Sequence, residues 1–159
     1  MSIAGPLFGS VVDVLRNAAT ATAIAVDPKS IYQAQMPTGN PQRPWMAIRL
    51  PTSPYDSTVW GASSNVRNGI FKVEVGLLAD IPQDATNPHP YGDATTPGIL
   101  TLVDDVLNAL ENGRATFMAA SPKLVDYAVT ASAFQKEDAL TASATITIIF
   151  ATRFTAGAR

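Results

Sequence analysis

The start of the chain carries apolar residues at helical spacing, which predict an amphipathic helix over about Leu7 to Ala19. The opposite side of this helix carries Asp13 and Arg16. Pro6 fits the first helical turn, because a residue there needs no N–H for hydrogen bonding. One face of the helix is therefore expected to be buried. Its apolar stripe comprises Leu7, Phe8, Val11, Val12 and Leu15.

Short strands are predicted next. The stretch Thr20 to Val26 is compatible with the end of the helix or with a strand, and Asp27-Pro28 ends it. Ile31 to Met36 predicts a short strand, and Pro37 to Pro41 predicts a turn. Trp45 to Leu50 predicts a more regular strand, because its apolar residues alternate in direction. Its two faces are Met46, Ile48 and Leu50 on one side and Trp45, Ala47 and Arg49 on the other.

Ile70 to Leu78 shows the clearest strand pattern of the chain. One face carries Phe71, Val73, Val75 and Leu77, and the other carries Lys72, Glu74 and Gly76. Such alternation is typical of a sheet that is covered on one side only. Two long loops, at about 51–69 and 79–95, are predicted on either side of this strand from their Pro, Gly, Ser and Asn content.

A second helix is predicted to start near Thr96, which is a good N-cap, with Pro97 in the first helical position. Its end is predicted at Asn112-Gly113, because glycine tolerates the left-handed conformation that often closes a helix. The apolar stripe of this helix comprises Ile99, Leu100, Val103, Val106, Leu107 and Leu110.

The last third of the chain predicts a hairpin. Gln135 to Asp138 forms its polar turn, and the return strand runs from Thr141 to about Arg153. A short flexible tail, 155–159, follows. The first strand alternates Val125, Tyr127, Val129 and Ala131 with Asp126, Ala128 and Thr130. The return strand places Ile146, Ile148 and Phe150 on one face and Thr145, Thr147 and Ile149 on the other.

Together these elements predict one α+β domain over residues 1–159. We expect a mainly antiparallel sheet of four to five strands with two helices packed on one face. The other face of the sheet is rich in Thr, Ser and Ala. It is left for water or for a neighbouring subunit.

Composition narrows the possible functions. The net charge is −2 and only 15% of residues are charged, against about 25% in typical domains. This weakly charged surface suits packing against further copies, and an ordinary protein with a bland surface is the alternative interpretation. The basic residues are scattered singly, so sequence-specific or nonspecific DNA binding is not expected. The scattered basic residues do not exclude passage of DNA through a pore, because passage requires no affinity for DNA.

Cysteine is absent, which excludes disulfides and Cys-ligated metal sites. The N-terminal residues lack the basic and apolar regions of a signal peptide. No apolar run approaches the length of about 20 residues that spans a membrane.

Candidate chemistry is sparse. The single histidine, His89, lies between two prolines, and a metal site there would depend on Asp84 or Asp93. We therefore interpret His89 as a loop residue. Asp104 and Asp105 are adjacent on the second helix and point in different directions, so they do not share a site. Motifs for phosphate binding, dinucleotide binding and serine hydrolysis are absent. We expect no catalysis, no metal and no cofactor.

Three aromatic residues in the predicted loops, Tyr55, Trp60 and Tyr91, are candidates for contacts with partners. Aromatic anchors are enriched at interfaces, although these side chains are equally compatible with folding back onto their own domain. The outward row Thr145, Thr147 and Ile149 is a second candidate interface, because the return strand has no charged residue before Arg153.

The order of elements from about Leu7 to Phe154 resembles the tail terminator (tail-completion) proteins of long-tailed bacteriophages. The resemblance rests on an opening helix, the strand Trp45-Met46-Ala47-Ile48-Arg49, a long loop, the strand Phe71-Lys72-Val73-Glu74-Val75, the helix Gly98 to Leu110 and a final hairpin. No invariant motif defines the family, and the loops here are longer than its pattern.

This resemblance implies a structural virion protein of the tail or neck, made in the host cytoplasm. The protein would form a ring, typically a hexamer, at the head-proximal end of the tail tube, with DNA passing through it. The ring would end tube growth and join the tail to the head, so its partners would be the tail tube protein and a neck or head-completion protein.

Alternatives are a neck or head-completion ring protein of the same particle, a small ligand-binding module that uses the two loops, and a small hydrolase or isomerase with an unrecognised site. The oligomeric state separates the ring proteins from the other two classes.

Overall fold

The computed structural model describes residues 4–33, 37–39, 41–60, 66–82, 91–92, 98–138 and 140–155. Within these residues the chain forms three α-helices, one short 3₁₀ helix and six strands. In chain order they are α1 (Ala4–Thr20), η1 (Pro28–Ser30), β1 (Ile31–Gln33), β2 (Trp45–Arg49), β3 (Tyr55–Trp60), β4 (Val66–Asp80), α2 (Ile99–Asn112), α3 (Arg114–Ala120), β5 (Leu124–Lys136) and β6 (Thr141–Thr155).

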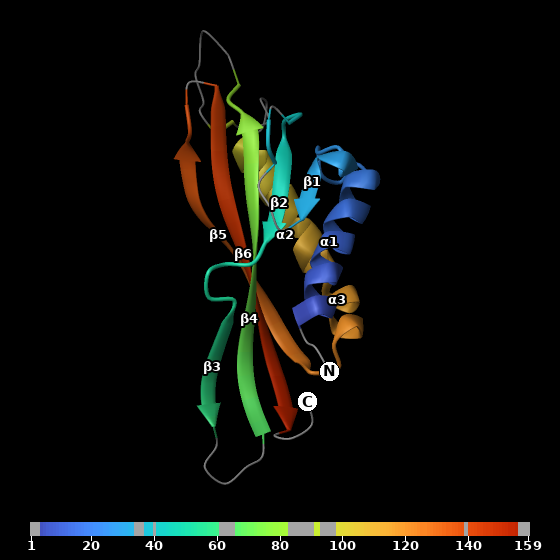
Figure 1. Cartoon of the computed structure of the whole chain (residues 1–159). Coiled ribbons are helices and arrows are strands. Elements are labelled where there is room, and N and C mark those ends of the chain that lie inside the picture. Colours follow the sequence, from blue (N-terminus) through green and yellow to red (C-terminus); the bar gives the residue numbers. More distant parts are fainter. Residues whose placement is uncertain are drawn as a thin grey trace.

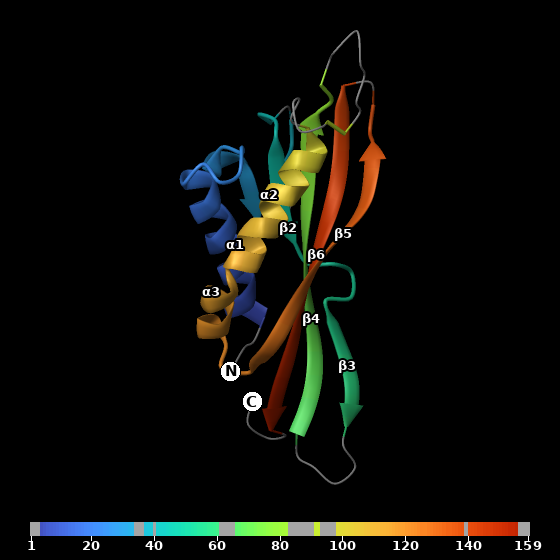
Figure 2. The same ribbon diagram turned by 180° about the vertical axis from the view of Figure 1, so that it is seen from behind.

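The strands form one mostly antiparallel sheet in the order β1-β2-β4-β6-β5, and β3 pairs with β4 off this path. Only the β1–β2 pair is parallel. Figure 2 shows α2 lying across one face of the sheet, with α1 and α3 on the same side. The predicted α+β class and the mainly antiparallel sheet are confirmed. The sheet has one strand more than predicted, and there is one helix more.

The central pair of strands, β4 and β6, is aligned over its whole length, from Val66 opposite Thr155 to Asp80 opposite Thr141. Both strands have 15 residues. Figures 1 and 2 show β3 and the adjoining ends of β4 and β6 extending beyond the helices. The molecule is therefore a helix-covered sheet with a narrower β-extension at one end.

The core lies between the helices and the inner face of the sheet, which is the face toward the helices. Helix α1 contributes Leu7, Val11 and Leu15, and β4 and β6 contribute the alternating residues predicted from the sequence. At one end of this core, aromatic rings cluster around Phe150. The ring centroids of Phe117 and Tyr127 lie 5.3 and 6.0 Å from that of Phe150, and both of these side chains are buried.

The predicted loop 51–69 is wrong in its central and final parts. Tyr55–Trp60 forms β3, which pairs with the start of β4, and β4 already begins at Val66. Pro51 and Pro54 precede β3 and favoured a loop prediction. The strand forms because it pairs with β4, a segment that follows later in the chain. Ala79 and Asp80, assigned to the second loop, are the last residues of β4. Most of the remaining loop lies outside the described residues.

The predicted start of the second helix is also wrong. Helix α2 begins at Ile99 with Gly98 as its N-cap, and Thr96 and Pro97 lie outside the described residues. Leu100 is exposed, whereas Leu102, which the predicted stripe omitted, is buried. The buried face is thus rotated slightly from the prediction.

Gly113 follows α2 for a different reason from the predicted one. Its φ of −80° is not left-handed, and the chain turns directly into α3. A Cβ at this position would lie 3.0 Å from both methyl groups of Val14 on α1. Gly113 therefore allows close packing of α1 against the junction of α2 and α3. Helix α3, which the sequence did not predict, buries Phe117 completely.

The final hairpin is confirmed, with differences at its ends. A bulge between Leu124 and Asp126 turns Val125 outward, so that Leu124 and Tyr127 are the buried residues. Gln135 and Lys136 belong to β5, and Glu137, Asp138 and Leu140 lie between the two strands. Strand β6 extends to Thr155, the first residue of the predicted tail, and 156–159 lie outside the described residues.

Two short predictions near the N-terminal helix are resolved. In the segment Thr20 to Val26, Thr20 is the last residue of α1, and 21–26 form a turn and bends and no strand. The Asp27 carboxylate then accepts a hydrogen bond from the backbone N–H of Lys29 and caps η1. Strand β1 covers Ile31–Gln33 of the predicted strand Ile31 to Met36, and 34–36 lie outside the described residues.

Candidate assembly surfaces

The sheet surface opposite the helices, called the outer face below, carries few charges. Strand β6 contributes the half-buried row Thr145, Thr147 and Ile149, which alternates with the fully buried Ile146, Ile148 and Phe150. Strand β5 adds Ala128 and Thr130 beside this row. The charged outer-face residues next to it are Arg49, Lys72 and Glu74. The predicted outward row of β6 is therefore a continuous uncharged strip on the uncovered side of the sheet.

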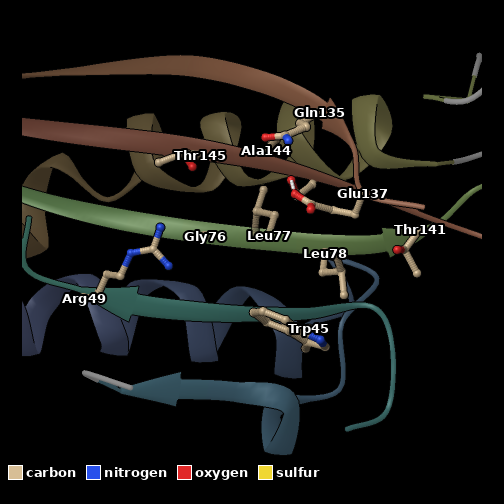
Figure 3. A pocket seen from close by; sticks show the side chains of 11 residues that line it. Trp45, Arg49, Gly76, Leu77, Leu78, Gln135, Glu137, Thr141, Ala144 and Thr145 are labelled. Carbon is tan, nitrogen blue, oxygen red and sulfur yellow. Dashed lines mark hydrogen bonds between the residues drawn. The ribbon is translucent and has the colours of Figure 1, made fainter. Parts of the chain in front are cut away.

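A groove of about 460 Å³ opens on the outer face near the β5–β6 turn. Figure 3 shows Trp45 beside Leu78 on one side of it, with Gln135 and Glu137 on the other. The groove is lined by Trp45, Arg49, Gly76, Leu77, Leu78, Gln135, Glu137, Thr141, Ser143, Ala144 and Thr145.

The position of Arg49 in this groove depends on Gly76. The guanidinium lies over the backbone of β4, and a Cβ at residue 76 would lie 2.9 Å from Arg49 Nη1. Arg49 Nε donates to Glu74 Oε2 at 3.3 Å. The positive charge is thus paired within the sheet, and the groove presents mostly apolar and hydroxyl groups.

The hairpin turn at one end of the groove is fixed by Asp138. Its carboxylate accepts hydrogen bonds from the backbone N–H groups of Leu140 and Thr141 and from the Thr141 hydroxyl, at 2.7, 2.8 and 3.0 Å. These bonds, led by that from Leu140, lower the pKa of Asp138. The Glu137 carboxylate accepts from the Ser143 hydroxyl across the same turn. These hydrogen bonds hold the turn, and with it this end of the groove, in one conformation.

The start of β5 is fixed to the helices. The Tyr127 hydroxyl donates to the carbonyl oxygens of Leu110 and Glu111 at 2.8 and 3.0 Å, and burial raises the pKa of Tyr127. Asp126 and Arg114 form an exposed ion pair at 2.9 Å. The backbone N–H of Tyr127 and then the Arg114 guanidinium lower the pKa of Asp126.

The candidate groups for chemistry lie apart or outside the described part of the chain. No cluster of three or more His, Asp or Glu residues that could hold a metal ion occurs there. His89 lies outside the described residues. Burial and the neighbouring Asp104 raise the pKa of Asp105, which is half-buried on the surface of α2. Asp104 itself is exposed.

The aromatic candidates differ in placement. Tyr55 is 63% exposed, and its ring lies 5.4 Å from that of Phe71. Tyr91 is half-buried, packs against the core and lies 6.1 Å from the Phe134 ring. Trp60 ends β3, but its side chain lies outside the described part of the structure. Tyr91 therefore contributes to its own domain, and Tyr55 keeps most of its surface open.

Sequence reasoning brought together Thr145, Thr147 and Ile149 but missed the groove. The sequence placed Arg49 on the strand face that carries Trp45 and Ala47. It placed Gly76 on the face that carries Lys72 and Glu74. The contact of Arg49 with Gly76 depends on the register of β2 against β4, in which Ala47 lies opposite Gly76 and Arg49 opposite Glu74. A single strand pattern contains no information about that register.

The sequence matches no protein-family model, and it has no significant match among curated proteins. No helix in the described residues is long and apolar enough to cross a membrane.

Proposed function

We propose that this protein is a ring-forming structural subunit of a long-tailed bacteriophage, the tail terminator at the head-proximal end of the tail tube. Its ring, of six copies by the family resemblance, ends tube growth and presents the surface that joins the filled head. Its partners are further copies of itself, the tail tube protein and a neck or head-completion protein. It acts through binding geometry and not through catalysis.

The observation that carries this proposal is the uncovered, uncharged strip of β6 on the outer face. From Thr141 to Thr152 the strand has no charged residue, and its outward row carries only small hydroxyl or apolar side chains. Sheet surfaces that face water permanently normally carry charges, which oppose association. A fixed neighbour in an assembly is the simplest reason for their absence.

The narrow β-extension gives further support. It projects beyond the helical layer (Figure 1), so part of the sheet is available to a neighbour without any rearrangement of the core. Contacts between different surfaces of successive copies generate closed rings when the rotation between copies closes. The outer face and the β-extension of the described residues offer such surfaces.

Native mass spectrometry of the purified protein tests this proposal. A single closed species that is a multiple of one chain, with six copies as the expected number, supports it. An exclusively monomeric protein, both alone and mixed with purified tail tubes, contradicts it. A closed ring that binds purified neck complexes but not tail tubes assigns the protein to the neck and refutes the terminator function.

A further inference from the structure

Three strands of the sheet, β5, β3 and β1, have an edge without a strand partner in the described residues. Strand β5 ends the order β1-β2-β4-β6-β5 on one side, and β3 lies on the other side of β4. Backbone N–H and C=O groups along such edges remain available for pairing with another chain. We call these rows the β5 edge (Leu124–Lys136) and the β3 edge (Tyr55–Trp60).

The third terminal strand, β1, is a poorer template. Only three of its residues are described, Ile31–Gln33. The side-chain amide of Gln33, in the orientation that satisfies its hydrogen bonds, accepts from the Arg16 guanidinium of α1 at 3.1 and 3.3 Å. A neighbouring strand would have little backbone to pair with there, and α1 lies beside it.

The β5 edge lacks the protection that monomeric sheets usually show. Charges and prolines on edge strands block association, but Tyr127 to Gln135 contains neither. Bulges interrupt the pairing of β5 with β6 only near its ends, between Leu124 and Asp126 and between Ser132 and Gln135. The segment between the bulges is regular and similar in length to the six residues of β3.

We propose that the β5 edge of one copy pairs with the β3 edge of the next copy, so that the sheet continues from subunit to subunit. This inference rests on the proposed ring and identifies the contact that closes it. The two edges lie on opposite sides of one sheet, so each copy uses both once and the contact is head-to-tail. A β5–β5 contact would stop at two copies and leave both β3 edges open.

Strand direction agrees with this contact. Strand β3 is antiparallel to β4, β4 to β6, and β6 to β5. Strands β3 and β5 therefore run in opposite directions in one copy. In a cyclic ring every copy has the same direction along the axis, so β5 meets the neighbouring β3 as an antiparallel pair.

The offset between the two edges is compatible with closure. The middle of β3 lies level with Thr152 of β6, and the middle of the regular segment of β5 lies level with Ile148. This offset is about 13 Å along the strands, and the repeat across four strand spacings is about 19 Å. A planar ring then needs strands tilted by about 35° from its axis, close to the tilt found in closed barrels.

Proline substitutions at neighbouring positions of β5 test the contact. In an antiparallel pair successive N–H groups point alternately to the partner strand and away from it. One of Thr130→Pro and Ala131→Pro therefore breaks the ladder to β6 and lowers the Tm. The other removes an N–H from the β5 edge, keeps a Tm within a few degrees of wild type and reduces the ring population at least tenfold. Thr130→Val and Ala131→Thr keep both N–H groups and serve as matched controls that assemble normally.

Hydrogen exchange of the folded proline variant and of the wild-type ring supplies a second measurement. We expect amides in β5 and β3 to exchange more slowly in the wild-type ring than in the variant. A folded proline variant that still forms wild-type rings, or equal exchange in both strands, overturns the edge contact and leaves the ring itself standing. A wild-type protein that never forms a ring, with or without tail tubes, overturns the proposed function and this contact together.

Discussion

At the scale of single residues, the structure depends on a few polar contacts between elements. Tyr127 joins β5 to the end of α2 by donating to the carbonyl oxygens of Leu110 and Glu111, in the last helical turn where carbonyl groups have few partners within the helix. Asp138 fixes the β5–β6 turn through three hydrogen bonds. Both residues hold the hairpin whose outer edge and outer face are the proposed contact surfaces.

Tyr127→Phe should lower the free energy of unfolding by about 0.5–1.5 kcal/mol, because the carbonyl oxygens of Leu110 and Glu111 lose the hydroxyl donor. Tyr55→Phe is the control, since Tyr55 is 63% exposed, and it should change stability little. Urea unfolding followed by circular dichroism measures both variants. Equal stability of Tyr127→Phe and wild type would show that the hydroxyl does not stabilise the junction.

Asp138 predicts a pH dependence of stability. Because hydrogen bonds lower its pKa in the folded protein, its stabilising effect is present above the ordinary pKa and is lost as the pH falls through the folded-state pKa. Wild type should exceed Asp138→Asn in stability at neutral pH, and the difference should shrink below about pH 4. Urea unfolding at a series of pH values measures this difference. A gap that stays constant into strong acid contradicts the assigned role.

At the scale of elements, patterns were informative where one face is buried against the core. Helix α1, strand β4 and strand β6 followed from their apolar periodicity, because burial in the folded chain repeats at the same spacing. Strand β3 was missed because it forms by pairing with β4 beyond the helical layer. Helix α3 was missed because it has only seven residues and follows a glycine that resembled a stop.

For the candidate surfaces too, local patterns predicted some features, and others depend on the pairing of distant segments. The outward row Thr145, Thr147 and Ile149 follows from the alternation of β6. The contact of Arg49 with Gly76 and the two open edges require strand order and register, which depend on how distant segments pair. A sequence without aligned relatives carries no direct signal for that pairing.

Val106→Asp tests the packing of α2 on the sheet. Val106 is completely buried in the core, so an unpaired carboxylate there should cost about 4 kcal/mol or more and unfold the domain. Leu107, which is half-buried, should tolerate the same change better. Asn108→Asp is the exposed control on the same helix. Thermal melting of the three variants tests this order, and a cooperatively folded Val106→Asp at wild-type stability contradicts it.

At the scale of the whole molecule, function depends on surfaces that a single copy leaves open. Each hydrogen bond of an edge contact contributes only about 0.5–1.5 kcal/mol net. A single edge contact is therefore weak. In a closed ring every copy makes two such contacts, one through each edge. The uncharged outer face is a second surface for association, because it carries no row of charges that would repel a neighbouring protein.

Thr147→Lys tests the outer face. Thr147 lies opposite Glu74 in the β4–β6 register, so a lysine there gains a partner of opposite charge and the folded subunit should stay stable. Assembly in the presence of tail tube protein should weaken at least tenfold by size-exclusion chromatography, because the charge must be desolvated where a neighbour covers the outer face. Ala119→Lys on the exposed surface of α3 is the control. Normal assembly contradicts the outer-face contact, and a large loss of stability would place Thr147 against its own subunit.

Electron microscopy of the purified protein mixed with tail tubes tests the central claim most directly. We predict closed rings, six-fold by the family resemblance, seated at one end of each tube, and tubes that no longer lengthen when tube protein is added. A protein that remains monomeric with and without tubes, or that binds along the tube wall, would contradict the terminator function.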